Sequence, residues 1–316
     1  MILLGAFLSI VSALSFSTNN ALARRGMTGA SASQGAFITV LLGVPLFLVA
    51  ALVSGQLFRA GDIPLNGYLL LAIAGILHFG VGRYCNYRAI GAVGSARSQP
   101  IQTMTIPYSI FIAWLFLGET IDLLMAIGIL LIMIGPAVII ERSSRLPAAP
   151  PRGAAQASGV KGAPPFQLRQ VEGYSFALLA ALCYGSSPIF IRAALEGQAG
   201  VSILGGTVSY IAAGLFVLLP MLLPGRRSMM RAINLRTFRL FFAAGFFVFF
   251  AQMLRFIALA LAPVAIVSPL QRLAALFTLF IAATINRDIE RINRKVVIGV
   301  IISLAGSVLL VFGGVR

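Results

Sequence analysis

The chain has 316 residues, of which 59% are hydrophobic and only 10% are charged, and its formal net charge at pH 7 is +16. This composition excludes an ordinary soluble domain. The positive charge does not indicate nucleic-acid binding, because the basic residues lie in short loops between apolar stretches, where membrane topology accounts for them. The two cysteines, Cys85 and Cys183, both fall inside apolar stretches, so neither a disulfide framework nor a metal site is expected.

Apolar stretches long enough to cross a bilayer follow one another along the whole chain, since a spanning helix needs about 20 mostly apolar residues. In chain order they lie at about 3–23, 33–54, 67–90, 95–117, 122–140, 173–194, 200–223, 237–259, 263–285 and 296–314. The strong apolar runs and the absence of long alternating patterns favour helices over an outer-membrane barrel. The first stretch resembles a signal peptide at Ala21-Leu-Ala23, but it lacks a basic leading segment. We therefore predict that it is the first transmembrane helix.

The second half of the sequence repeats the first. A shift of 169 positions pairs Tyr87 with Phe256, Pro100 with Pro269, and Gln102 with Gln271; after a slip of two more residues, Glu119 pairs with Glu290. Internal repeats are the common plan of secondary transporters, whose binding site lies at the repeat interface. The sequence predicts an all-α membrane protein with ten transmembrane helices, arranged as two inverted five-helix repeats. The repeats occupy residues 1–140 and 173–316, and a linker rich in Pro, Ala and Gly joins them at 141–172.

The distribution of basic residues predicts the orientation of the chain. Most of the 24 Lys and Arg residues lie on the side of the linker, and few lie on the side of the termini. The positive-inside rule then places the linker in the cytoplasm and both termini outside, in a multi-pass protein of the inner membrane. The two halves carry their basic residues in alternate loops, as an inversion of one half relative to the other requires.

These features together resemble a known family. An aromatic-x-Ala motif (Tyr87-Arg-Ala89) precedes a helix with an early proline, and Gly118-Glu119 is followed by Gly128 and Gly135. This order, present in both halves, is similar to the drug/metabolite transporter superfamily, in its ten-helix type with two EamA domains. The second half departs from the pattern, because it reads Asp288-Ile-Glu290 without the preceding glycine.

The resemblance covers nearly the whole chain and implies a central cavity between the repeats and transport by alternating access. It does not supply a substrate. Members of the family often keep their termini in the cytoplasm, whereas the charges of this chain indicate the reverse, and we follow the charges.

Three arginines lie inside the predicted spans, where a charged side chain is costly and marks a functional site by default. Arg83 shares a helix face with Asn86, and the 169-residue shift places this pair on Gln252 and Arg255. Guanidinium groups bind carboxylate or phosphate bidentately, so we predict an electropositive chamber for an anion. The candidate substrate-binding residues are Arg272, Arg83, Arg255, Asn86, Gln102, Gln252, Gln271, Tyr87, Tyr184, Asn19 and Ser187. The alternative stays open that the arginines near span ends bond backbone carbonyls or reach toward the interface.

We therefore expect a secondary transporter for a small anionic or zwitterionic metabolite, such as an amino acid or an organic acid. The alternatives are a flippase for a lipid-linked sugar or phospholipid, and a membrane scaffold that transports nothing. An enzyme is not expected, because no cluster of carboxylate, His or Cys residues suggests catalysis at the membrane surface. All eight acidic residues fall in loops or at span edges, which disfavours an exporter of cationic drugs.

The expected partners are the small-molecule substrate and the lipid bilayer, with no cofactor, no metal and no nucleic acid. A homodimer stays open. His78, the one histidine of the chain, lies within the third span and could titrate near neutral pH. A hydrogen-bonded structural role is more common for such a histidine, and proton coupling stays open as well.

Overall fold

The computed structural model describes residues 1–26, 30–93, 98, 101–102, 104–140, 169–219, 234–274, 276–277, 281 and 294–315. Every regular element in these ranges is a helix. Of the expected linker at 141–172, residues 141–168 lie outside the described residues. The prediction of an all-α membrane fold is confirmed by these helices, of which six are both long and apolar enough to cross a membrane.

The helices of the first half follow the predicted spans closely. They are α1 (Ile2–Gly26), α2 (Ala32–Val53), η1 (Gln56–Asp62), α3 (Leu65–Gly75), η2 (Ile76–Gly82), α4 (Arg83–Val93), α6 (Thr105–Leu117) and α7 (Leu123–Ile140). Helix α2 begins at a capping box, in which the Ser31 hydroxyl accepts from the Gln34 N–H and the Gln34 side chain accepts from the Ser31 N–H. The segments α3, η2 and α4 form one continuous span with η2, a π-helical stretch, in its middle.

The second half contributes α9 (Gln170–Leu195), η4 (Ala199–Val201), α10 (Ser202–Leu218), α12 (Leu235–Leu261), α13 (Val264–Gln271) and α15 (Arg294–Val315). Helix α12 begins where the Asn234 side chain accepts a hydrogen bond from the Thr237 N–H at 2.8 Å. The outward surface of α12 is apolar, since Phe242, Phe246 and Phe250 are all exposed. Such a surface matches lipid rather than water.

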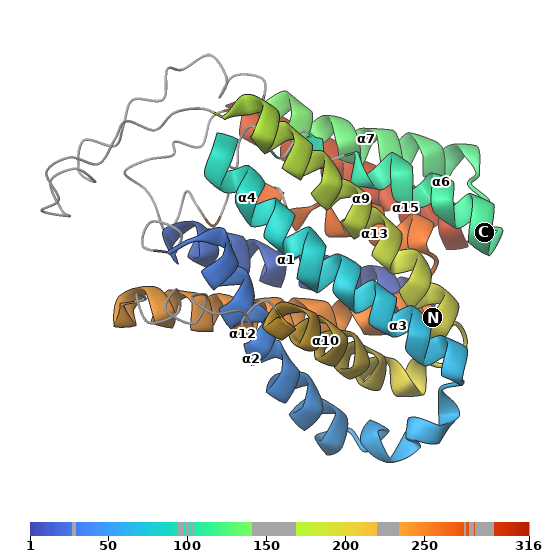
Figure 1. The fold of residues 1–316 in the computed structure, drawn as a ribbon. Helices are drawn as coiled ribbons and strands as arrows, with labels where there is room; N and C mark the ends of the chain where they lie inside the picture. Colours follow the sequence, from blue (N-terminus) through green and yellow to red (C-terminus); the bar gives the residue numbers. More distant parts are fainter. Residues whose placement is uncertain are drawn as a thin grey trace, which may run out of the picture.

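Helices of the two halves pair reciprocally. Helix α1 packs on α12 and α4 packs on α9, so the first helix of each half contacts the third helix of the other. Helix α2 packs on α10, and α7 packs on α15. Figure 1 shows the same arrangement, with α2, α10 and α12 gathered in one part of the bundle and α6, α7 and α15 in another. This exchange of partners is what a pseudo-two-fold axis between two repeats produces.

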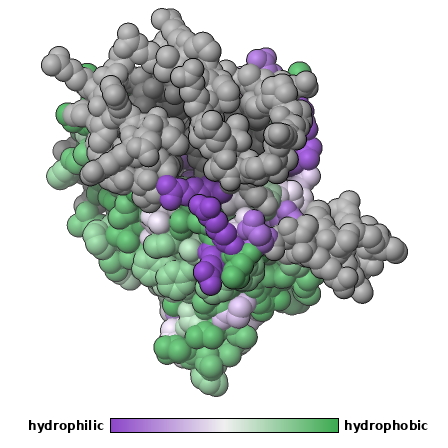
Figure 2. Space-filling view, turned by 90° about the vertical axis from the view of Figure 1, so that its left-hand side faces the viewer, coloured by the Kyte–Doolittle hydropathy of each residue, from purple (hydrophilic) through white to green (hydrophobic). Residues whose placement is uncertain are grey.

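The two chain ends lie at one end of the bundle, which we name the terminal side (Figure 1). Helix α7 ends and α9 begins at the opposite end, which we name the linker side. Figure 2 views the molecule from the linker side, where hydrophilic residues gather near the centre and apolar residues cover much of the remaining described surface. On this face, therefore, the described polar residues form a group that is bordered by apolar surface.

The fourth helix of each half is interrupted at equivalent positions, which the sequence analysis did not predict. Within the expected span 263–285, α13 ends at Gln271, and the N–H groups of Arg272 and Leu273 donate to carbonyls three residues back, at 2.9 and 3.1 Å. Within the expected span 95–117, the Met104 N–H makes the same type of bond to the Ile101 carbonyl at 3.1 Å, and α6 begins one residue later. Interrupted helices at matching places in two repeats are typical of transporter binding sites.

Small residues allow the closest contacts between helices. A Cβ atom on Gly75 would overlap the backbone of Ser209, so α3 and α10 touch at their main chains. Gly128 and Gly306 meet in the same manner, because a Cβ on either would come within 2.7 Å of the carbonyl oxygen of the other. Such contacts are the usual way in which helices pack in lipid.

Candidate functional site

Arg83 is the first residue of α4 and is 4% exposed, in the interior of the bundle. Its guanidinium donates from Nη1 to the Thr39 hydroxyl of α2 and from Nη2 to the Tyr210 hydroxyl of α10, both at 3.2 Å. The guanidinium carbon also lies 5.2 Å from the ring centroid of Phe79 and 5.9 Å from that of Tyr210. Arg83 is therefore held by neutral hydroxyls and aromatic rings at the contact between the repeats.

Arg255, on α12, forms a second polar group with residues of α9 and η2. The guanidinium is 2% exposed and donates from Nη1 to Gln252 Oε1 at 3.2 Å and from Nη2 to Ser187 Oγ at 2.8 Å. Ser187 Oγ also lies 2.8 Å from His78 Nδ1, and Gln252 Nε2 lies 3.4 Å from His78 Nε2. Four side chains from three elements therefore close into a ring of hydrogen bonds in the bundle interior.

The buried arginines differ from those near helix ends in having no acidic partner in the part of the chain that the structure describes. Among the described residues, the ion pairs are Arg59–Asp62, Arg88–Glu172, Arg169–Glu172 and Arg192–Glu196. All of their acidic members lie in loops or near the ends of helices. Arg83 and Arg255 are paired with none of the described acids. A buried charge without a counter-charge is costly in the membrane interior.

Arg272 lies at the interruption that follows α13, in the turn formed by residues 272–273. It is partly exposed, unlike Arg83 and Arg255. It lies close enough to Arg255 and Tyr184 to interact with them electrostatically. The structure thus brings the three arginines predicted from the sequence into one region, with Arg272 the most accessible of the three.

Other predicted residues fall at different distances from this region. Tyr184 lies against the imidazole of His78, with ring centroids 4.6 Å apart. Asn86 and Gln102 bond to each other at 2.7 Å, and no described bond joins them to either arginine. Tyr87 is buried near Arg83 and packs against Phe241, Ala23 and Ala36. Of these residues, Tyr87 lies beside Arg83, and Asn86 and Gln102 form a separate bonded pair.

We name as the polar cluster Arg83 and Arg255 with the side chains bonded around them, Thr39, Tyr210, Gln252, Ser187 and His78. Two predicted residues lie outside it. Gln271 donates to the Ser12 hydroxyl at 3.4 Å, which joins α13 to α1. Asn19 is 2% exposed and bonds to Asn20, or in the other orientation of its amide to the Ala244 carbonyl at 3.1 Å. Gln271 therefore ties α13 to α1, and Asn19 ties α1 to α12 in the second orientation of its amide. Neither residue reaches Arg83 or Arg255 by a described bond.

Three residues of the cluster were not among the predicted binding residues. His78 was noted in the sequence as the one histidine but was not assigned to the site. Thr39 and Tyr210 stand in apolar stretches of α2 and α10 and gave no repeat signal, because their partner in the cluster lies on a third helix. A search for isolated polar side chains in otherwise apolar spans would have found all three.

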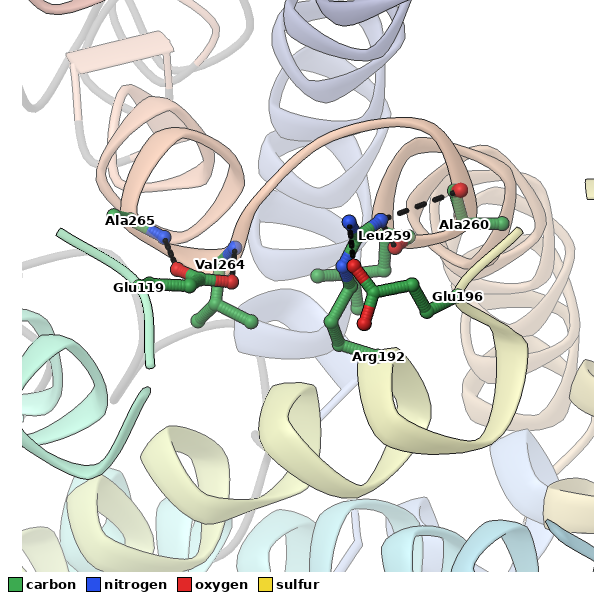
Figure 3. Close-up of polar contacts among 7 residues, drawn as sticks. All are labelled: Glu119, Arg192, Glu196, Leu259, Ala260, Val264 and Ala265. Carbon is green, nitrogen blue, oxygen red and sulfur yellow. Dashed lines mark hydrogen bonds and ion pairs between the residues drawn. The ribbon is translucent and has the colours of Figure 1, made fainter. Parts of the chain in front are cut away.

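The terminal side of the bundle carries a pocket of about 490 Å³, away from the polar cluster, lined by residues that include Glu119, Arg192 and Glu196. The two oxygens of the Glu119 carboxylate accept from the N–H groups of Val264 and Ala265, at 2.8 and 2.9 Å (Figure 3). These N–H groups belong to the first two residues of helix α13, where a carboxylate is favoured by the free backbone donors and the helix dipole. Glu119 therefore fastens the first repeat to the interrupted helix of the second.

Arg192 holds the same pocket from the other side. It donates from Nη1 to the carbonyls of Leu259 and Ala260, at 3.0 and 3.3 Å, and from Nη2 to Glu196 at 2.7 Å (Figure 3). These carbonyls belong to the C-terminal end of α12, where a positive charge is stabilising. The loop from α12 to α13 is thus held at both ends, by Arg192 and by Glu119.

Comparisons with known proteins agree with this architecture. A solved structure described as "Crystal structure of protein" superposes with a TM-score of 0.71 at 16% sequence identity, covering 99% of this chain and 98% of that one. This likeness shows a shared fold. A search of curated proteins gave no match. The model of the EamA-like transporter family matches twice, over residues 3–140 and 171–312. Two consecutive matches over nearly the whole sequence show that the chain belongs to the EamA-like transporter family, in its two-repeat form.

Proposed function

We propose that this membrane transporter moves a small metabolite carrying a carboxylate or phosphate, such as an organic acid or an amino acid, and that Arg83 and Arg255 bind it. The observation that carries the proposal is the absence of a described acidic partner for two fully buried guanidinium groups. A bound anion would supply the missing negative charge. Guanidinium also offers several donors in one plane, which suits the two oxygens of a carboxylate.

Transport is proposed to occur by alternating access, with the substrate held between the repeats. The interruptions after α13 and before α6 support this mechanism, because a change to three-residue backbone bonds within a helix often marks a hinge. The bonds of Glu119 to α13 and of Arg192 to the end of α12 support a terminal side that is fastened in this conformation. Opening of that side would require the Glu119 carboxylate to leave the two N–H groups.

The protein is proposed to reside in the inner membrane with the linker side in the cytoplasm. The basis is the excess of Lys and Arg on that side of the sequence. Attachment of a membrane-impermeant label to single cysteines would test this orientation. Labelling of a cysteine placed at exposed Gly61, on the terminal side, should succeed in intact cells, and its protection in intact cells would reverse the proposed orientation.

The anion site is tested by thermal stability of the purified protein against a panel of amino acids, organic acids, sugar phosphates and amines. A ligand that binds the folded state raises its stability, so an anion of the correct class should raise the melting temperature of the wild type. Arg255→Gln should lose this shift, and Arg272→Gln should reduce it. Arg59→Gln is the matched control, because Arg59 is exposed and paired with Asp62 outside the cluster.

Stabilisation of the wild type and the Arg255→Gln protein to the same extent by an amine or a neutral compound would contradict the proposal. The expected loss of affinity in Arg255→Gln is about ten- to a hundredfold, because a hydrogen bond to a charged group contributes about 1.5–3 kcal/mol. Arg272→Gln should show a smaller loss, since Arg272 is more accessible to solvent than Arg255.

A further inference from the structure

The ring of hydrogen bonds around His78 has a direction that can be derived from its donors and acceptors. A guanidinium has donors and no acceptor, so the group that it contacts must accept. The atom of Gln252 that faces Arg255 is therefore its carbonyl oxygen, Oε1. The amide NH₂ of Gln252 then faces His78 Nε2.

The state of His78 follows from that orientation. A nitrogen that faces an NH₂ group can only accept, so Nε2 carries no proton. The proton of the neutral imidazole is then on Nδ1, which donates to Ser187 Oγ at 2.8 Å. Ser187 Oγ accepts from Arg255 Nη2 as well, and its two lone pairs are sufficient for both bonds. The network thus specifies a neutral His78 in one tautomer.

A second proton on His78 conflicts with this network. It would direct an Nε2–H group at the NH₂ of Gln252, and a turn of the Gln252 amide would direct that NH₂ at the Arg255 guanidinium instead. Either arrangement sets two donors against each other. The added positive charge would also lie beside the arginines without a described counter-charge.

The charged and titratable groups around His78 contain no acid in the described part of the chain. Helix α2 has no titratable residue, and Tyr68 of α3 bonds to Ala60 at the terminal side. The groups contributed by the other neighbouring elements are Tyr184 from α9, Tyr210 from α10, Arg83 from α4, Arg255 from α12 and Arg272 after α13. None of the described residues supplies a negative charge at this place, and a bound anion would supply one.

We infer that His78 is the proton-binding site of this transporter, and that it takes up one proton together with the anion through a turn of the Gln252 amide. An anion that engages the Arg255 guanidinium frees Gln252 Oε1 from that group. The amide can then turn and present Oε1 to His78 Nε2, which becomes a donor. The proton comes from the solution to which the chamber is open and returns to solution on the opposite side when the anion leaves.

This inference rests on the proposed anion site and adds the coupling ion to it. Binding of the anion and of the proton then favour each other, and the coupling must be reciprocal. Lowering the pH should strengthen anion binding by up to tenfold per pH unit, in the interval where the anion-bound form holds the proton and the empty form does not. Movement of a monoanion together with one proton carries no net charge.

The direct test uses the fact that the chain contains one histidine. In tag-free protein labelled with nitrogen-15 histidine, every ring signal belongs to His78. At neutral pH the empty wild type should show a neutral ring with the proton on Nδ1. Gln252→Glu places a fixed carboxylate between Arg255 and His78, and it should convert the ring to the doubly protonated form at the same pH. Gln252→Leu, which supplies no carboxylate, should leave the ring neutral.

A doubly protonated ring in the empty wild type, a proton on Nε2 in place of Nδ1, or a neutral ring in Gln252→Glu would each overturn the inference. The measurement needs no ligand, so it is independent of the anion proposal. A second measurement follows the dissociation constants of sulfate and of each anion that stabilises the wild type. Sulfate keeps the same charge across the interval in which histidine ordinarily titrates, about pH 5 to 8. A dissociation constant that does not decrease when the pH is lowered would refute the coupling while leaving the anion site intact. Failure of every anion to bind would refute the proposed function instead.

His78→Gln is the matched variant for the pH dependence. Glutamine can keep one hydrogen bond to Ser187, but it cannot take up a proton. Anion binding to this variant should show no pH dependence beyond that of the ligand itself. In proteoliposomes, a pH gradient should drive anion accumulation by the wild type and should fail to do so with His78→Gln. Equal accumulation by both proteins would overturn the inference.

Discussion

Two groups of arginines in this molecule lie in opposite electrostatic situations. Near the helix ends, Arg192 and Arg88 are paired with Glu196 and Glu172. In the interior, Arg83 and Arg255 bond to hydroxyl and amide groups and to none of the described acids. The same side chain therefore serves two purposes. The outer arginines satisfy carboxylates and backbone carbonyls, and the inner ones have no described counter-charge, which is the basis of the proposed anion site.

The largest effect is expected from the interior group. Arg83→Met and Arg255→Met keep much of the side-chain volume but remove the charge, and each should weaken anion binding by about a hundredfold. The empty protein should be as stable as the wild type or more stable, because an uncompensated buried charge is removed. The melting temperature with and without ligand measures both effects. A large loss of stability in the empty variants would make these arginines structural and would remove the difference between the two groups.

Arg192→Gln should have the next largest effect, and on stability alone. The change removes the bonds to two carbonyls at the end of α12 together with the ion pair to Glu196, and we expect a loss of about 1–3 kcal/mol. Glu196→Gln is the control, since it removes the exposed carboxylate but keeps the carbonyl bonds. Chemical denaturation of both variants would measure the difference. An Arg192→Gln protein with weakened anion binding would place this outer arginine in the binding site.

Glu119→Gln should reduce stability by about 0.5–2 kcal/mol, the usual range for loss of a helix cap. The amide can still accept from one of the N–H groups of Val264 and Ala265, but it carries no charge to favour the start of α13. Thermal unfolding measures the effect, and Glu119→Ala should give the larger loss of the two. Equal stability of all three proteins would show that the contact does not fasten the terminal side.

The smallest effect is expected at the exposed pair of Arg59 and Asp62. Their side chains are 56% and 49% exposed, and such a pair contributes about 0–1 kcal/mol. Arg59→Gln should change the melting temperature only slightly. The rise in melting temperature on addition of the anion should equal that of the wild type. A strong effect on anion response would mean that positive charge anywhere on the protein is sufficient, and the distinction between inner and outer arginines would fail.

Much of the architecture follows from the sequence because each level of it leaves a repeated signal. Apolar length indicates the spans, and the matching of Pro100 with Pro269 indicates the two-repeat plan. The bonds around Arg83 leave no such signal. Its partners Thr39 and Tyr210 are 44 and 127 residues away, so only the folded chain shows that they meet. The helix interruptions after α13 and before α6 are equally hidden, since an apolar stretch does not reveal a change from one backbone bond pattern to another.

The predicted binding residues divide according to the same rule. Arg83, Arg255 and Gln252 were found from charge and from the repeat, and the structure brings the last two into contact. Gln271 and Asn19 are matched by the repeat with Gln102 and Ser187. In the structure Gln271 joins α13 to α1, and Asn19 joins α1 to α12 in the second orientation of its amide. Repeat symmetry relates backbone positions, whereas the polar contacts depend on side chains that differ between the two copies.

The most direct test of the central claim is counterflow in proteoliposomes. Vesicles loaded with an unlabelled anion that stabilises the protein are diluted into a trace of the same labelled anion. If the chain moves an anion held by its interior arginines, the wild type and Arg59→Gln should accumulate label transiently, and Arg255→Met should not. Accumulation by Arg255→Met at the wild-type rate, or counterflow of an amine by the wild type in place of any anion, would contradict the account.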